Sequence, residues 1–134
     1  MMFEEFNFSA RQIDNYFNAA SRDFKIAADS SVPEIIFRFS YDALIKLAIS
    51  ICAKNSLRVK ARSGHHIELL KKLSEFIDDK EIDAIGNTMR RKRNYDLYGG
   101  GILMSEKEAG EYRDWLKNIF VKVEVYLSVN LKLF

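Results

Sequence analysis

Apolar residues recur at steps of three and four through most of the chain, which is the spacing of amphipathic helices. In the first such segment the shared face is made by Ile13, Tyr16, Phe17, Ala20, Phe24 and Ala27. This pattern predicts a helix over about 9–28. Ser9 is a candidate N-cap, because a serine hydroxyl accepts a hydrogen bond from the unpaired N–H groups of a first helical turn.

A second helix is predicted from a Ser31 cap to about Lys54. Pro33 and Glu34 would stand in its first turn, where a missing N–H does no harm and a carboxylate suits the helix dipole. The apolar residues of this segment cover more than one stripe. We therefore expect either the central helix of the fold or a helix that also faces a partner subunit.

Three further helices are predicted, over about 65–77, 81–95 and 105–129. The last begins at Ser105 with Glu108 three residues on, the pattern of a capping box. Short connections favour antiparallel neighbours. The expected fold is one all-α domain over residues 1–134, an up-and-down bundle of four to five helices.

The composition is typical of a helical domain that folds without disulfide bonds or a structural metal ion. The chain has 134 residues, 48% of them apolar and 30% charged, with a single proline and six glycines. A β-rich domain normally has more turn residues at short intervals. Cys52, His65 and His66 are too few for the four ligands of a structural zinc site, so neither metal nor cofactor is expected.

The chain is expected to be cytoplasmic and not to enter a membrane. Its first ten residues carry Glu4 and Glu5 and no cation, whereas a secretory signal begins with a basic region. The most apolar run, 43–53, is much shorter than the roughly 20 residues of a membrane span.

Charge is segregated along the chain although the net charge is only +2. Residues 54–72 hold six cations and one anion, and 90–101 hold four cations and one anion. In an up-and-down bundle the ends of the second and fourth helices and the starts of the third and fifth would meet. We therefore expect one basic end that attracts a polyanion. Its predicted binding residues are Lys54, Arg58, Lys60, Arg62, His65, His66, Arg90, Arg93 and Asn94.

The stretch 89–100, Met-Arg-Arg-Lys-Arg-Asn-Tyr-Asp-Leu-Tyr-Gly-Gly, resembles the signature region of the HEPN superfamily, the higher eukaryotes and prokaryotes nucleotide-binding domains. In members that cleave RNA, an arginine and a polar residue are followed by a histidine four to six residues after the arginine. Arg93 and Asn94 match the first two positions, and Tyr98 stands in the histidine position. The resemblance implies a helical bundle, commonly a homodimer, with Arg93 and Tyr98 as the candidate catalytic pair.

Tyrosine is a poor replacement for that histidine. A phenol with a pKa of about 10 is only about one part in a thousand ionised at pH 7, and RNA cleavage without a metal needs a base nearer neutrality. The leading hypothesis is therefore a HEPN-like domain, similar to nucleotidyltransferase substrate-binding domains, without efficient catalysis. It would bind RNA, a nucleotide or a minimal nucleotidyltransferase partner at the basic end.

Two alternatives stay open. One is a metal-independent ribonuclease toxin of a toxin–antitoxin pair, with Arg93 and a displaced base such as His65 or His66. The other is a structural interaction module whose partner docks on the wide apolar face of the second helix. The cations at 90–93 are also compatible with an ordinary solvated helix face, or with cations that complement the dipole at a helix end.

Overall fold

The computed structural model describes residues 2–98 and 104–132, with side chains described over 2–95 and 104–128. Its elements, in chain order, are β1 (Phe3–Glu5), α1 (Ala10–Asp29), α2 (Pro33–Lys54), β2 (Leu57–Val59), α3 (His65–Ile77), α4 (Lys80–Tyr98) and α5 (Glu106–Lys132). Helices make up most of the described chain. The predicted all-α bundle is confirmed.

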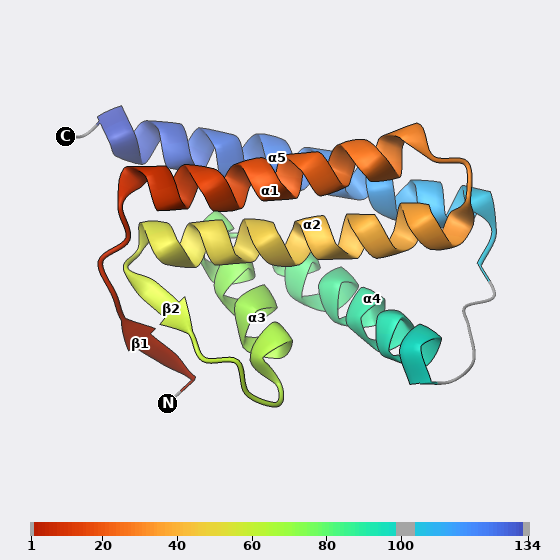
Figure 1. The fold of residues 1–134 in the computed structure, drawn as a ribbon, viewed down its shortest axis with the longest axis horizontal. Coiled ribbons are helices and arrows are strands. Elements are labelled where there is room, and N and C mark those ends of the chain that lie inside the picture. The colour runs from red at the N-terminus through yellow and green to blue at the C-terminus, as the bar shows by residue number, and fades with distance from the viewer. Residues whose placement is uncertain (1, 99–103, 133–134) are drawn as a thin grey trace.

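Helix α2 lies at the centre of the fold and packs against α1, α5 and α3. Figure 1 shows α1 running antiparallel to α2, and α5 extending along the same long axis. The α3–α4 hairpin lies on the other side of α2 and is turned away from its direction (Figure 1). The wide apolar surface of α2 is thus mostly buried inside the chain, where Phe37, Tyr41, Leu44, Leu47 and Ile51 are fully inaccessible.

The two N-terminal caps differ from each other. Ser9 caps α1 as predicted, because its Oγ accepts from the Gln12 N–H at 3.1 Å while its own N–H donates to Gln12 Oε1 at 2.8 Å. The predicted Ser31 cap of α2 is wrong. Pro33 occupies the first helical position, so the extended residue before it, Val32, becomes the N-cap.

Two short strands were not predicted. β1 pairs antiparallel with β2, with Phe3 opposite Val59 and Glu4 opposite Arg58. Arg58 Nη2 lies 2.8 Å from Glu4 Oε1 across the pair. Each strand has only three residues, and their partners are more than fifty positions apart, so no local alternation of apolar and polar residues marks them.

The predicted meeting of four helix ends is wrong for the end of α2. β2 and the residues after it carry the chain away from the end of α2 before α3 begins, and α5 begins at the opposite end of the molecule from the end of α2 (Figure 1). The later turns of α4 come together with the start of α3 and, through Lys92 and Glu108, with the start of α5. The acidic connection between α3 and α4 instead lies against α5, where Lys122 Nζ is 2.7 Å from Asp79 Oδ2.

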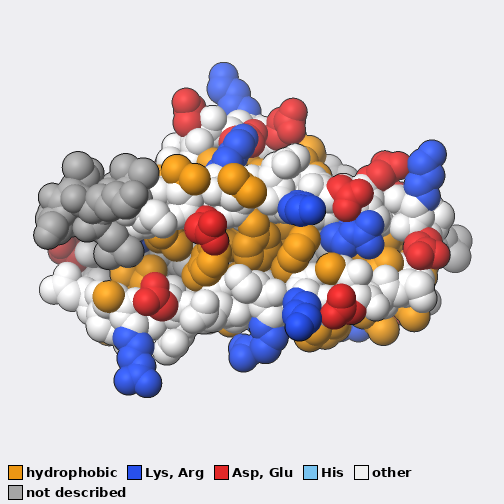
Figure 2. Space-filling model, turned by 90° about the horizontal axis from the view of Figure 1, so that it is seen from above, with side chains coloured by type: hydrophobic (Ala, Val, Ile, Leu, Met, Phe, Trp, Pro, Cys, Tyr) orange, Lys and Arg blue, Asp and Glu red, His pale blue; other side chains and the backbone are white. Residues whose placement is uncertain are grey.

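Two other contacts shape the packing. α3 and α4 approach closely at Gly86, where an added Cβ would stand 2.8 Å from Leu70 Cδ2. On the far side of the fold, the rings of Phe17 and Phe24 from α1 lie 5.9 and 5.0 Å from that of Phe120 on α5. Figure 2 looks onto this side and shows an apolar strip flanked by charged side chains.

Within the described residues, no helix is long and apolar enough to cross a membrane.

Candidate functional site

A recess of about 420 Å³ lies between the start of α3 and the later turns of α4. The loop before α3 contributes Arg62, α3 contributes His65 and His66, and α4 contributes Arg90, Arg93 and Asn94. The other lining residues are small or apolar. Among the described residues that line this recess there are three arginines and no carboxylate.

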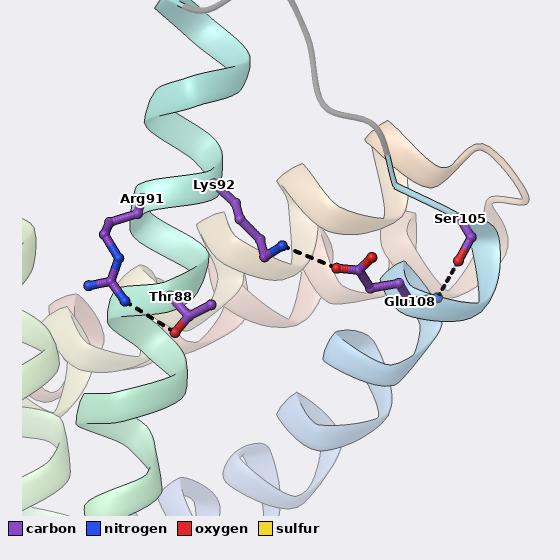
Figure 3. Close-up of polar contacts among 5 residues, drawn as sticks. All are labelled: Thr88, Arg91, Lys92, Ser105 and Glu108. Carbon is purple, nitrogen blue, oxygen red and sulfur yellow. Dashed lines mark hydrogen bonds and ion pairs between the residues drawn. The ribbon is translucent and has the colours of Figure 1, made fainter.

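The four consecutive cations of α4, residues 90–93, lie in different surroundings. Arg90 and Arg93 are three positions apart, so they lie on one side of the helix and line the recess. Arg91 turns toward its own helix, with Nη2 3.4 Å from Thr88 Oγ1. Lys92 reaches α5, where its Nζ lies 3.2 Å from Glu108 Oε1 (Figure 3). Only half of this basic run therefore serves the recess.

The contact to Glu108 also depends on the start of α5. The Glu108 N–H donates to Ser105 Oγ at 3.0 Å, which is the serine half of the predicted capping box (Figure 3). The Glu108 carboxylate accepts from Lys92. This ion pair connects α4 to α5 and helps to hold the recess-lining part of α4 in place.

His66 is bonded to the core behind the recess. Its Nδ1 lies 2.8 Å from the hydroxyl of Tyr41, a fully buried residue of α2. Burial, followed by the charges of His65, Arg93 and Arg90, lowers the pKa of His66 to about 4. His66 is consequently a neutral imidazole at pH 7.

His65 has a different partner. Its Nδ1 is 2.7 Å from the carbonyl oxygen of Arg62. A carbonyl oxygen can only accept, so His65 Nδ1 carries a proton and donates it. When this ring is neutral, its lone pair is on Nε2. The two adjacent histidines therefore differ in what their rings can offer to a ligand.

The guanidinium of Arg93 lines the recess above the ring of Tyr41. Its Cζ lies 6.0 Å from the ring centroid of Tyr41, and within the described part of the chain no carboxylate forms an ion pair with it. The nearby carboxyl of Asp42 has a raised pKa, because burial and then Asp23 outweigh the opposing charges of Arg93 and other cations. Asp23 itself is paired with Lys46.

Three predicted binding residues do not reach the recess. Lys54 lines a separate pocket of about 270 Å³ that also contains Phe8. Arg58 is bound to Glu4 on β1. Lys60 continues the strand ladder, with its N–H donating to a backbone carbonyl at 2.8 Å. The prediction that they join the other cations is wrong, because the pairing of β2 with β1 draws this segment toward the N-terminus.

The predicted pair Arg93 and Tyr98 cannot be compared in space. α4 ends at Tyr98, whose side chain lies outside the described residues, as does the glycine run at 99–101. Conversely, sequence reasoning missed Tyr41. Nothing in its local pattern separates it from the other core residues of α2.

The described residues contain no group of three or more His, Cys, Asp or Glu side chains that could hold a metal ion. Cys52 is buried in α2, and burial raises the pKa of its thiol to about 12. The recess presents hydrogen-bond donors and positive charge, which suit an oxyanion.

No family model matches this chain, and no curated protein or solved structure matches it. The geometry of the recess is therefore the basis for the functional interpretation.

Proposed function

We propose that the protein binds phosphate groups of RNA or of a nucleotide in the recess between α3 and α4, without efficient catalysis. The observation that carries this proposal is the composition of the two walls. Arg90 and Arg93 on α4 face a wall made by Arg62, His65 and His66, and no described lining residue is acidic. Such a surface attracts anions, and none of its described lining residues carries a negative charge.

The chemistry of the donors favours phosphate. An arginine guanidinium can give two parallel hydrogen bonds to phosphate oxygens, and such charged pairs are about twice as strong as neutral ones. The start of α3 adds its dipole. Its N-cap is Gly64, and among the described residues no side chain makes a capping hydrogen bond to this helix, whose first turn holds Glu68 and whose His65 N–H donates to the Arg62 carbonyl at 3.0 Å.

The same geometry argues for binding over turnover. A base with a pKa of about 4, as in His66, removes a hydroxyl proton poorly at neutral pH. The match of Arg93 and Asn94 to the HEPN signature supports an RNA or nucleotide ligand. The resemblance also implies a homodimer and a nucleotidyltransferase-type partner. We include both in the proposal on the basis of the resemblance alone.

Binding of a fluorescein-labelled single-stranded RNA, followed by fluorescence anisotropy, tests the proposal. Arg93→Gln is expected to weaken binding by about tenfold, since it removes a charge-assisted pair inside the recess. Arg91→Gln is the matched control, because it removes an equal charge from the same helix outside the recess. We expect less than about a twofold change there, and steep weakening of wild-type binding as salt rises.

Equal losses in the two variants would show that RNA responds to the general charge of α4 and would contradict a recess site. Salt-insensitive capture of the RNA, or no binding to RNA and nucleotides at all, would favour the interaction-module alternative. The wide face of α2 that this alternative used is mostly buried in the chain.

A second candidate function is RNA cleavage with His65 as the base. It is favoured by one observation, the hydrogen bond from His65 Nδ1–H to the Arg62 carbonyl, which leaves the Nε2 lone pair for the recess. Incubation of total RNA with wild type, His65→Gln and Arg93→Ala tests it. Cleavage lost in both variants supports the enzyme, and identical cleavage by all three proteins removes it.

A further inference from the structure

Tyr41 is the only described side chain that reaches His66 from the core side with a hydrogen bond. The tyrosine comes from the central helix α2, is fully buried, and places its hydroxyl 2.8 Å from His66 Nδ1. Either the Tyr41 hydroxyl or His66 Nδ1 donates the proton in this hydrogen bond. If the hydroxyl donates, the neutral ring carries its proton on Nε2, and if Nδ1 donates, Nε2 has a lone pair.

The proton in this contact belongs to the tyrosine. Burial raises the pKa of Tyr41 far above its ordinary value, so its hydroxyl keeps its hydrogen. Within the described residues that hydroxyl has one hydrogen-bond partner, His66 Nδ1. If Nδ1 were the donor, the buried hydroxyl hydrogen of Tyr41 would have no acceptor, which costs about 1–3 kcal/mol.

We propose that Tyr41 is a positioning residue that holds His66 with its proton on Nε2, so that this N–H donates into the recess to a bound phosphate. The ring geometry supports this direction, because Nδ1 and Nε2 point away from each other and Nδ1 is tied to the core. The inference rests on the proposed function, since it assigns one more donor to the same anion site.

This assignment gives His66 and His65 opposite tautomers when both are neutral. His65 donates from Nδ1 to the Arg62 carbonyl, and His66 accepts at Nδ1 from Tyr41. The rings are neighbours, with centroids 4.4 Å apart. Both rings line the recess, and when both are neutral they differ in which nitrogen carries the proton, because their partners at Nδ1 differ.

The histidine ring ¹⁵N spectrum of the full chain at neutral pH reads both tautomers, and the chain has only two histidines. We expect His66 to show an unprotonated Nδ1 and a protonated Nε2. Tyr41→Phe keeps the ring beneath Arg93 and removes only the hydroxyl. It should shift His66 to a mixture of tautomers and weaken inorganic phosphate binding by about three- to tenfold.

Tyr126→Phe is the matched control. It removes a tyrosine hydroxyl that is also hydrogen-bonded, to Asn55 at 3.0 Å, but away from the recess. The His66 spectrum and the phosphate affinity should stay unchanged in this variant. A general loss of stability would affect both variants, whereas the tautomer signature should respond to Tyr41 alone.

A wild-type His66 protonated on Nδ1 would overturn the inference without reference to any variant, so the test survives a Tyr41→Phe protein that fails to fold. A Tyr41→Phe protein that folds and keeps the wild-type tautomer would also overturn it. If the tautomer is as inferred but phosphate disturbs neither His66 nor Arg93, the proposed function fails and the role of Tyr41 in setting the tautomer stands.

Discussion

Replacement of His66 by glutamine should remove much of the acid sensitivity of the fold near pH 5. In the wild-type protein His66 is kept neutral by burial and by the positive charges of Arg90 and Arg93. An unfolded chain has no such restraint, so its histidine takes up a proton near its ordinary pKa. Protonation therefore favours unfolding.

The magnitude follows from the two pKa values. The ordinary value is 6.5 and the folded value is about 4, so between these limits the unfolded state binds more protons than the native state. The stability contributed by neutral His66 is present above pH 6.5 and is lost as the pH falls toward 4. The full difference corresponds to roughly 3 kcal/mol, and solvent screening of a half-buried ring reduces the expected loss to about 2 kcal/mol.

Urea unfolding at a series of pH values between about 4 and 7.5 measures this effect, with the free energy of unfolding compared between wild type and His66→Gln. The carboxylates titrate in both proteins, so the difference between the two curves isolates His66. We expect the wild type to lose about 2 kcal/mol more than the variant across this range. His65→Gln should keep most of the wild-type pH dependence, because burial is the largest cause of the lowered His66 pKa and the charge of His65 is only the second. Parallel curves for wild type and His66→Gln would refute the reasoning.

Three other variants test the packing by urea or thermal unfolding. Gly86→Ala should lose about 1 kcal/mol, because crowding of the Leu70 side chain outweighs the better helix propensity of alanine, and a more stable variant would contradict this contact. Ser40→Ala should be neutral or up to about 1 kcal/mol more stable, since the buried Ser40 Oγ has no partner within the described residues, and a clear loss would show that it has one. Tyr126→Phe should lose about 1 kcal/mol with the hydrogen bonds to Asn55, and an unchanged stability would mean that they contribute nothing.

The parts of the fold set by local interactions could be predicted from the sequence. The third helix was predicted over 65–77, where α3 lies, and Ser9 was predicted as the cap of α1. Both depend on residues within a few positions of one another. β1 and β2 could not be predicted, because each is three residues long and is stabilised only by the other, far away in the sequence.

The same distinction applies to the site. The sequence placed the two histidines together with Arg90 and Arg93, as the recess does, but it also included Lys54, Arg58 and Lys60. Helical phase turns Arg91 and Lys92 away from the recess, and the β1–β2 pairing takes Arg58 elsewhere. Tyr41 could not be found, since a tyrosine on the most apolar helix looks like any other core residue until its hydroxyl is placed against a histidine.

Amide and arginine side-chain ¹H–¹⁵N spectra, recorded while inorganic phosphate is added to the full chain, test the central claim most directly. The account predicts saturable shifts confined to residues 62–67 and 90–94, and their loss in Arg93→Gln but not in Arg91→Gln. Shifts spread evenly over exposed lysines and arginines, or centred on Lys54 and Arg58, would contradict a phosphate site between α3 and α4.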